Sequence, residues 1–216
     1  VDIPFFAANI SKLLHGAWFP IAIGAAFFTL MLTWAKGRHI LAAEFYRTTR
    51  PVHQFAVDLV SHPPNRIAGD GVFLTGSRNA VPIALAQNIK HNNVLHNRTI
   101  LLHFHVEDVP WVPNLKKVET EKLVGGFHRI VARHGFMEDP QLDRVLTLAR
   151  EQGLDIDFEK ATFYLGRESL ILGARPGMAR WRANLFMFMS RNSADAGSFF
   201  GLPPEQVMEI GIRLEI

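Results

Sequence analysis

His103 and His105 are the residues of this chain whose spacing comes nearest to that of a metal site. Side chains two positions apart in a strand point to the same face of a sheet, so the two imidazole rings share one side. Four other histidines could approach the pair in the fold: His91, His96, His128 and His134. Zinc needs three or four converging ligands, and one pair does not meet that requirement. We therefore predict histidines that face solvent or form hydrogen bonds, and no bound metal.

A second candidate is the turn of residues 75–82, which joins the end of an expected strand to the start of an expected helix. Free backbone N–H groups at such a position can bind phosphate. The turn contains Ser77 and Arg78 but lacks the lysine of a phosphate-binding loop and the repeated glycines of a dinucleotide fingerprint. An ordinary turn is favoured, with Ser77 and Arg78 as candidate anion contacts.

Arginines recur around an expected helix in the last quarter of the chain, at Arg167, Arg175, Arg180, Arg182 and Arg191. The helix also carries an apolar stripe, made of Met178, Trp181, Leu185, Phe188 and Met189. The stripe predicts packing in a core, and the arginines predict a solvated face. Contact of Arg180 and Arg182 with anionic lipid or a nucleotide is the alternative, and these two residues complete the candidate anion site with Ser77 and Arg78.

Two acidic residues, Glu119 and Glu121, share a face of an expected strand with Lys117. This arrangement suits charge pairing across strands better than general acid–base catalysis. No serine lies in the sequence context of a nucleophile elbow, and no other group of residues suggests an active site. The sequence predicts no enzyme activity and no cofactor.

The elements that would position these residues alternate between strands and helices. Strands are expected at residues 71–75, 99–106, 117–123, 127–133, 161–166 and 208–216, from their β-branched and aromatic content. Helices are expected at residues 81–95, 140–152 and 177–190, with a shorter amphipathic helix that begins near Pro51. This pattern predicts an α/β domain, a mixed sheet with flanking helices.

An uncharged apolar run at residues 17–35 precedes this domain. About 20 helical residues span the hydrocarbon core of a bilayer, and Trp18 and Trp34 lie near its two ends, where indole rings favour the interfaces. Basic residues follow the run, at Lys36, Arg38, Arg47 and Arg50, against one acid, Glu44. The excess of positive charge places the C-terminal side in the cytoplasm. A buried core helix of a soluble protein is the alternative.

The chain starts with Val1, inside apolar sequence, which suggests a start within a longer polypeptide. Residues 1–14 predict the end of a preceding membrane helix or an interfacial segment, where Asp2 and Asn9 either line a pathway or lie at the interface. Residues 15–40 then form the transmembrane helix, residues 41–66 a basic connector and residues 67–216 the cytoplasmic domain. The net charge of +3 does not suggest a nucleic-acid partner, and the absence of cysteine excludes disulfides.

Long strings of this chain resemble the KUP/HAK/KT family of potassium transporters. In the domain these are GDGVFLT, NIKHNNVLHNRTILL, FHRIVARHGFMEDP, ATFYLGRESL, RPGMARWRANLFMFMSRN and FFGLPPEQVMEIG, in the order of the family. The string HGAWFPIAIGAAFFTLMLTWAKGR is similar to the last membrane helix of the family. The resemblance covers nearly the whole chain and ordered strings of this length are specific.

The resemblance implies proton-coupled potassium uptake by a multi-pass protein of the bacterial inner membrane, through more N-terminal helices that this sequence does not contain. It also implies a cytoplasmic domain that regulates or assembles the transporter, with a homodimer and a regulatory nucleotide as possible partners beside membrane lipid. No transport residue can be assigned here. The alternative function is a membrane-tethered sensor that binds a nucleotide or anion, and a third is a soluble enzyme, which would require residues 17–35 to be core.

Overall fold

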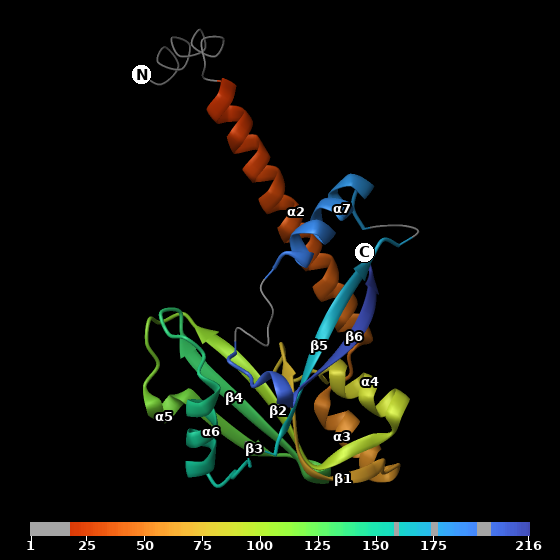
Figure 1. Ribbon diagram of the computed structural model, residues 1–216, viewed down its shortest axis with the longest axis vertical. Coiled ribbons are helices and arrows are strands. Elements are labelled where there is room, and N and C mark those ends of the chain that lie inside the picture. Colours follow the sequence, from red (N-terminus) through yellow and green to blue (C-terminus); the bar gives the residue numbers. More distant parts are fainter. Residues whose placement is uncertain (1–17, 158–159, 174–176, 194–199) are drawn as a thin grey trace. The chain divides into compact units, whose positions relative to one another are not determined.

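A computed structural model of the chain describes residues 18–157, 160–173, 177–193 and 200–216 (Figure 1). The chain forms two compact units. Of the described residues, one unit comprises 18–44, 170–173, 177–193 and 215–216, and the other comprises 45–157, 160–169 and 200–214. The expected segment 1–14, with Asp2 and Asn9, lies outside the described residues, as does Arg175.

The larger unit is built on a six-stranded sheet in the order β3-β4-β2-β1-β5-β6. Its strands are β1 (Asn65–Thr75), β2 (Val94–Glu107), β3 (Val118–Lys122), β4 (Phe127–Gly135), β5 (Thr162–Ile171) and β6 (Val207–Glu215). Strand β1 pairs in parallel with β2 and β5, β2 pairs in parallel with β4, and β3 pairs antiparallel with β4. The expected mixed sheet is confirmed.

Helices cover both faces of this sheet (Figure 1). They are α3 (Val52–Ser61), α4 (Ile83–Asn92), α5 (Asn114–Lys117) and α6 (Leu142–Glu151), with short 3-10 turns η2 (Val124–Gly126) and η3 (Pro204–Gln206). Alternate residues of the central strands enter opposite cores, because side chains alternate across a strand. Val72 and Ile100 pack with α6 on one face, whereas Phe73 and Leu101 pack with α3 and α4 on the other.

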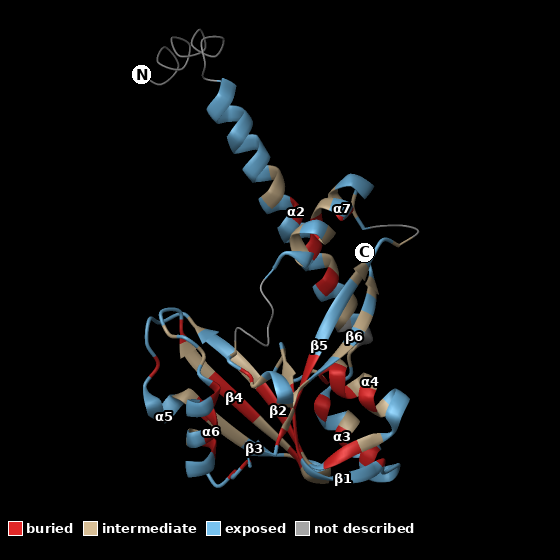
Figure 2. Ribbon diagram, in the orientation of Figure 1, coloured by how far each residue is buried: buried red, intermediate tan, exposed pale blue. Residues whose placement is uncertain are grey.

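Buried residues lie along the central strands (Figure 2), and aromatic rings are among them on both faces of the sheet. Phe73 stacks on Tyr164 with ring centroids 4.3 Å apart, and Phe163 on the opposite face is fully buried. Burial of each such ring stabilises the fold by roughly 1.5–3 kcal/mol. The double-sided core makes the sheet a rigid support for the polar residues at its edges.

Strand β1 is longer than the strand expected at residues 71–75. A bulge interrupts its first half, so the side chains there do not alternate regularly between the two faces of the sheet. Its register with β2 shifts between Ile67 and Asp70, where Gly69 has a φ of 96°. A side chain is disfavoured at that φ. Gly71 is required for a different reason: a Cβ there would lie 2.5 Å from the ring of His96.

Several helix boundaries differ from the expected ones by a few residues. Helix α4 begins directly after Pro82 and ends at Asn92, and the next residue, Asn93, adopts a left-handed conformation with φ 49°. Left-handed asparagine is a common helix terminator, so residues 94 and 95 belong to β2 instead. Helix α5 was not expected, and Lys117 belongs to it and not to β3.

The smaller unit contains helix α2 (Trp18–Thr48) as far as Glu44, together with helix α7 (Arg180–Arg191). Residues Trp18–Phe45 of α2 form a helix long and apolar enough to cross a membrane. Its large side chains are mostly exposed, among them Phe19, Phe27, Phe28 and Met31. This exposure contradicts the alternative that the helix is a buried core element of this chain.

Candidate functional site

The end of the apolar run in α2 forms one candidate site, because α7 packs against it (Figure 1). Thr33, Gly37 and Leu41 are buried, whereas most of their neighbours on α2 are exposed. Their spacing of four residues aligns them on one side of the helix. The sequence alone does not show which side of the helix is buried there, because its polar and apolar residues do not follow the helical period clearly.

Two contacts anchor α7 on this stripe. The Nε of Arg182 donates a hydrogen bond to the Thr33 hydroxyl oxygen at 3.1 Å. The ring of Phe186 lies 5.5 Å from that of Trp34 and fills the space above Gly37. A hydrogen bond from a charged donor contributes roughly 1.5–3 kcal/mol, so this pairing holds α7 at a defined height on α2.

The apolar stripe expected to pack in a core does not do so. Trp181 and Phe188 are 59% and 66% exposed, and only Ala183 and Phe186 of α7 are buried. Residues 183 and 186 lie on the side of the helix opposite to residues 181 and 188. Helix α7 is thus apolar on two sides, of which α2 covers one.

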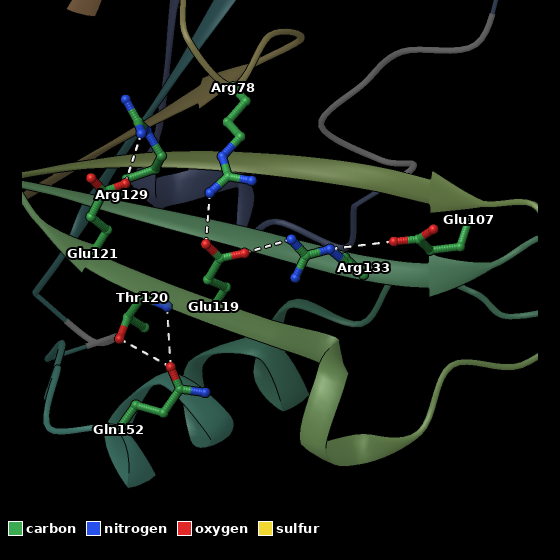
Figure 3. A network of polar contacts seen from close by, with 8 residues as sticks. All are labelled: Arg78, Glu107, Glu119, Thr120, Glu121, Arg129, Arg133 and Gln152. Carbon is green, nitrogen blue, oxygen red and sulfur yellow. Dashed lines mark hydrogen bonds and ion pairs between the residues drawn. The ribbon is translucent and has the colours of Figure 1, made fainter. Parts of the chain in front are cut away.

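The second candidate site is a network of charged residues at the β3 edge of the sheet (Figure 3). The carboxylate of Glu119 accepts hydrogen bonds from Arg78, at 2.6 Å, and from Arg133, which also contacts Glu107 at 3.3 Å. Glu121 pairs with Arg129, its neighbour across the strands, at 2.7 Å. The charge pairing expected of these two glutamates is confirmed, although Lys117 is not their partner.

Glu119 is held in its charged form by this network. The hydrogen bond from Arg133, together with the charge of Arg78, lowers the pKa of Glu119 below its usual value. The carboxylate is 41% exposed, and exposed ion pairs contribute only about 0–1 kcal/mol each. The network therefore sets the orientation of the side chains more than the stability of the domain.

Glu138 is the most strongly bound carboxylate among the described residues. It accepts hydrogen bonds from the backbone N–H groups of Gly135, at 2.8 Å, and Val112, at 3.0 Å, and it forms an ion pair with the ammonium of Lys117. These bonds, with the Gly135 N–H the largest cause, lower the pKa of Glu138 to about 2. This role could not be read from the sequence, because Lys117 belongs to α5, Gly135 ends β4 and Val112 lies in a loop.

A hollow of about 320 Å³ adjoins Glu138 and is lined by Phe104, Trp111, His134, Arg144 and Leu148, among others. Its basic residues have partners already: Lys117 pairs with Glu138, Arg133 with Glu119, and Arg144 donates to the Asn114 side chain. Trp111 itself is 62% exposed. The hollow offers an aromatic wall with paired charges, which does not select one ligand.

A buried polar pair, His96 and Tyr164, lies within the sheet. The Nε2 of His96 is 2.9 Å from the Tyr164 hydroxyl, and burial lowers the pKa of His96. Next to it, Arg98 binds both oxygens of Asp70, at 2.5 and 2.6 Å. The glycines of the GDG sequence therefore admit a histidine ring and a bulge around a bound aspartate.

The remaining expected sites are dispersed. Nδ1 of His103 is 3.0 Å from the Thr75 carbonyl oxygen, and its ring lies 6.0 Å from that of His105. Within the described residues no three histidine or acidic side chains are grouped to hold a metal ion. Ser77 closes a turn with the Thr75 side chain, at 2.9 and 3.2 Å.

The four candidate anion contacts come from both units. Ser77 and Arg78 belong to the α/β unit, where Glu119 binds Arg78. Arg180 and Arg182 belong to the unit of α2 and α7, where Arg182 binds Thr33 and Arg180 is exposed. Arg78 and Arg180 are exposed, whereas Ser77 and Arg182 are half-buried, and each pair has its own surroundings.

The chain matches two family models, each over a different part of its length. Residues 68–216 match the family model described as the K+ potassium transporter C-terminal domain. Residues 1–39 match the model described as the K+ potassium transporter integral membrane domain. No solved structure matches the chain significantly.

Curated relatives match along the whole chain. A probable potassium transport system protein Kup of Chlorobium chlorochromatii is 46% identical over 216 residues, which are 100% of this chain and 35% of the relative. Proteins with the same description from Chlorobium phaeobacteroides and Myxococcus xanthus are each 44% identical, over 34% and 33% of their lengths. The chain spans about a third of these relatives. It belongs to the K+ potassium transporter family, a family of membrane transport proteins and not of enzymes.

Proposed function

We propose that this chain is the C-terminal part of a membrane potassium uptake transporter that works as a potassium/proton symporter. The observation that carries the proposal is the end-to-end similarity to potassium transport proteins, together with a helix of membrane-spanning length at the expected place. The complete protein crosses the bacterial inner membrane several times. Residues after about 36 lie on the cytoplasmic side, in keeping with the basic residues that follow Trp34.

The cytoplasmic domain has a regulatory or assembly role in this proposal. The support is the path of the chain: after β5 it returns to α2, where α7 binds Thr33 and packs on Gly37. A ligand or a second subunit that changes the domain can act on α2 through that segment. A homodimer and a regulatory nucleotide are the partners that would use this route.

Potassium uptake is tested by expression of the complete gene in a bacterium that lacks its own potassium uptake systems. Growth at limiting potassium and accumulation of rubidium are the expected results. Absence of both, with the protein present in the membrane, would refute the transport function.

Proton coupling is tested separately in proteoliposomes, where an imposed inward proton gradient should drive rubidium uptake. Uptake that follows the membrane potential alone would refute symport.

The domain role is tested by removal of residues 49–216 from the complete protein. A regulatory domain predicts that the shortened protein still reaches the membrane and transports with altered dependence on potassium. An assembly domain predicts loss of the protein from the membrane. An antibody against residues 67–216 identifies the alternative function: a membrane band near the size of this chain alone leaves no room for an ion pathway and favours the tethered sensor.

A further inference from the structure

Helix α7 has a second apolar side that no described residue covers. Trp181 and Phe188 are 59% and 66% exposed and lie seven residues apart, on one side of the helix. Leu185 and Met189, both half-buried, continue the apolar surface beside them. Two aromatic rings exposed on one side of a helix form an apolar surface, and its transfer from water to an apolar environment is favourable.

Basic and polar side chains border that apolar side along one edge. Arg180, Asn184 and Arg191 are exposed and recur at spacings of four and seven residues, which places them together on the helix. The Leu185 and Met189 edge lies opposite. Around the circumference of α7 the order is therefore the α2 contact, an apolar edge, the two exposed rings, and an edge with two arginines.

The contacts with α2 fix the height at which this helix sits. Arg182 binds Thr33, and Phe186 packs on Trp34 and Gly37. Thr33 and Trp34 are among the last residues of the uncharged run that ends at residue 35, and Gly37 lies between the first exposed charges after it, Lys36 and Arg38. About 19 helical residues cover roughly the thickness of the hydrocarbon core, so the run ends at the level of the lipid headgroups.

We propose that α7 lies in the membrane interface, with Trp181 and Phe188 inserted among lipids and Arg180 and Arg191 at anionic headgroups. Indole rings favour the boundary between headgroups and acyl chains, and basic residues at the cytoplasmic surface are attracted by anionic lipid. The occupant of the exposed side is thus the bilayer that surrounds α2, with acidic lipids on its inner face. This inference rests on the proposed membrane-spanning role of α2.

The test uses spin labels on single cysteines in the complete protein, reconstituted into nanodiscs with anionic lipid. Any cysteine outside these 216 residues is replaced by serine; the chain itself has none. Phe188→Cys should carry a label that collides with oxygen more than with a water-soluble nickel chelate, so that the ratio of the two accessibilities exceeds one. Arg191→Cys is the matched site on the other edge, and its ratio should fall below one. Rubidium uptake confirms that both labelled proteins are functional.

Two results would overturn the inference. A label at residue 188 that the nickel chelate reaches readily faces water, and one that neither reagent reaches is covered by protein. Failure of the α2 assignment is distinguishable, because a label at Phe27→Cys would then be reached by the chelate.

The role of charge is tested with Arg180→Gln/Arg191→Gln, which should lower the oxygen-to-nickel ratio at residue 188. The control Lys116→Gln/Lys122→Gln removes the same charge from the α/β unit and should leave that ratio unchanged; equal effects of both pairs would exclude headgroup contact.

Discussion

The ring of Phe186 lies against Gly37 so closely that a Cβ on that glycine would sit 2.3 Å from Cδ2 of the ring. Glycine is therefore required at this point of α2 by the helix that crosses it. Within the unit of α2 and α7, this contact and the Arg182–Thr33 hydrogen bond join residues about 150 positions apart in sequence. They provide the link through which the proposed regulation reaches the membrane helix.

Gly37→Ala should displace Phe186 and loosen α7, because a methyl group forced into a packed site costs roughly 1–3 kcal/mol. The expected result is a lower melting temperature of the complete protein in detergent and a change in rubidium uptake per molecule in the membrane. Gly24→Ala is the matched control, since no atom lies within 4 Å of a Cβ at that position of the same helix. Equal effects of the two substitutions would show that helix geometry, and not the α7 contact, is responsible.

Thr33→Val keeps the shape of the side chain but removes the oxygen that accepts from Arg182. The half-buried guanidinium then loses a partner, at a cost of about 1–3 kcal/mol. Amide hydrogen exchange of residues 180–191, followed by mass spectrometry, should become faster in this variant. Thr33→Ser retains the hydroxyl and should exchange like the wild type. Unchanged protection in Thr33→Val would mean that packing of Phe186 alone holds the helix.

Much of the α/β domain could be predicted from local pattern, and the reasons are visible in single residues. Val72 and Phe73 alternate between two cores, which is the signal that a central strand gives in sequence. The packing of α7 on α2 could not be predicted, because Thr33 and Arg182 are far apart and neither helix shows which side it buries. An apolar stripe indicates that one side of a helix is buried, but it does not identify the partner. Here α2 covers only the side of α7 that carries Phe186.

The charged and polar sites likewise include contacts that could be predicted from the sequence and contacts that could not. Cross-strand pairing of Glu121 with Arg129 follows from strand alternation and was expected. The binding of Glu138 was not, because its partners Lys117 on α5, Gly135 at the end of β4 and Val112 in a loop come from separate parts of the chain. Spacing predicts contacts within one element or between adjacent strands, whereas contacts between loops depend on the finished fold.

Stability of the domain should fall in acid as Glu138 takes up a proton. Its folded pKa of about 2 is below the ordinary value of about 4.5, so the folded state binds the proton less well than the unfolded state. The contribution is complete above about pH 4.5 and is lost as the pH falls toward about 2. Unfolding of the complete protein across this range is the measurement. In Glu138→Gln this component of the pH dependence should disappear, whereas the exposed Glu121→Gln should retain it.

The buried pair of His96 and Tyr164 predicts a second pH effect, nearer neutrality. Burial lowers the pKa of His96 from about 6.5, so folding favours the neutral ring. Stability is then complete above about pH 6.5 and declines as the pH falls below that value, because the unfolded state gains the proton first. Replacement of His96 by asparagine should reduce the slope of the unfolding profile below about pH 6.5, to which His103, His128 and His134 also contribute because burial lowers the pKa of each. The exposed His53→Asn is the control and should leave that slope in place.

Arg78→Gln and Glu119→Gln should each destabilise the domain by less than about 1 kcal/mol, since both side chains are more than 40% exposed and salt screens their attraction. The double variant isolates the pair, and its coupling energy should shrink further as the ionic strength is raised.

The same variants test the anion contacts expected at Ser77 and Arg78. Loss of Glu119 leaves Arg78 without that carboxylate, so a phosphate site at this turn would bind more tightly in Glu119→Gln and not at all in Arg78→Gln. Titration of phosphate and nucleotide by calorimetry measures both, and equal behaviour of the two variants would show that Thr75, Ser77 and Arg78 form a structural turn held to the edge of the sheet.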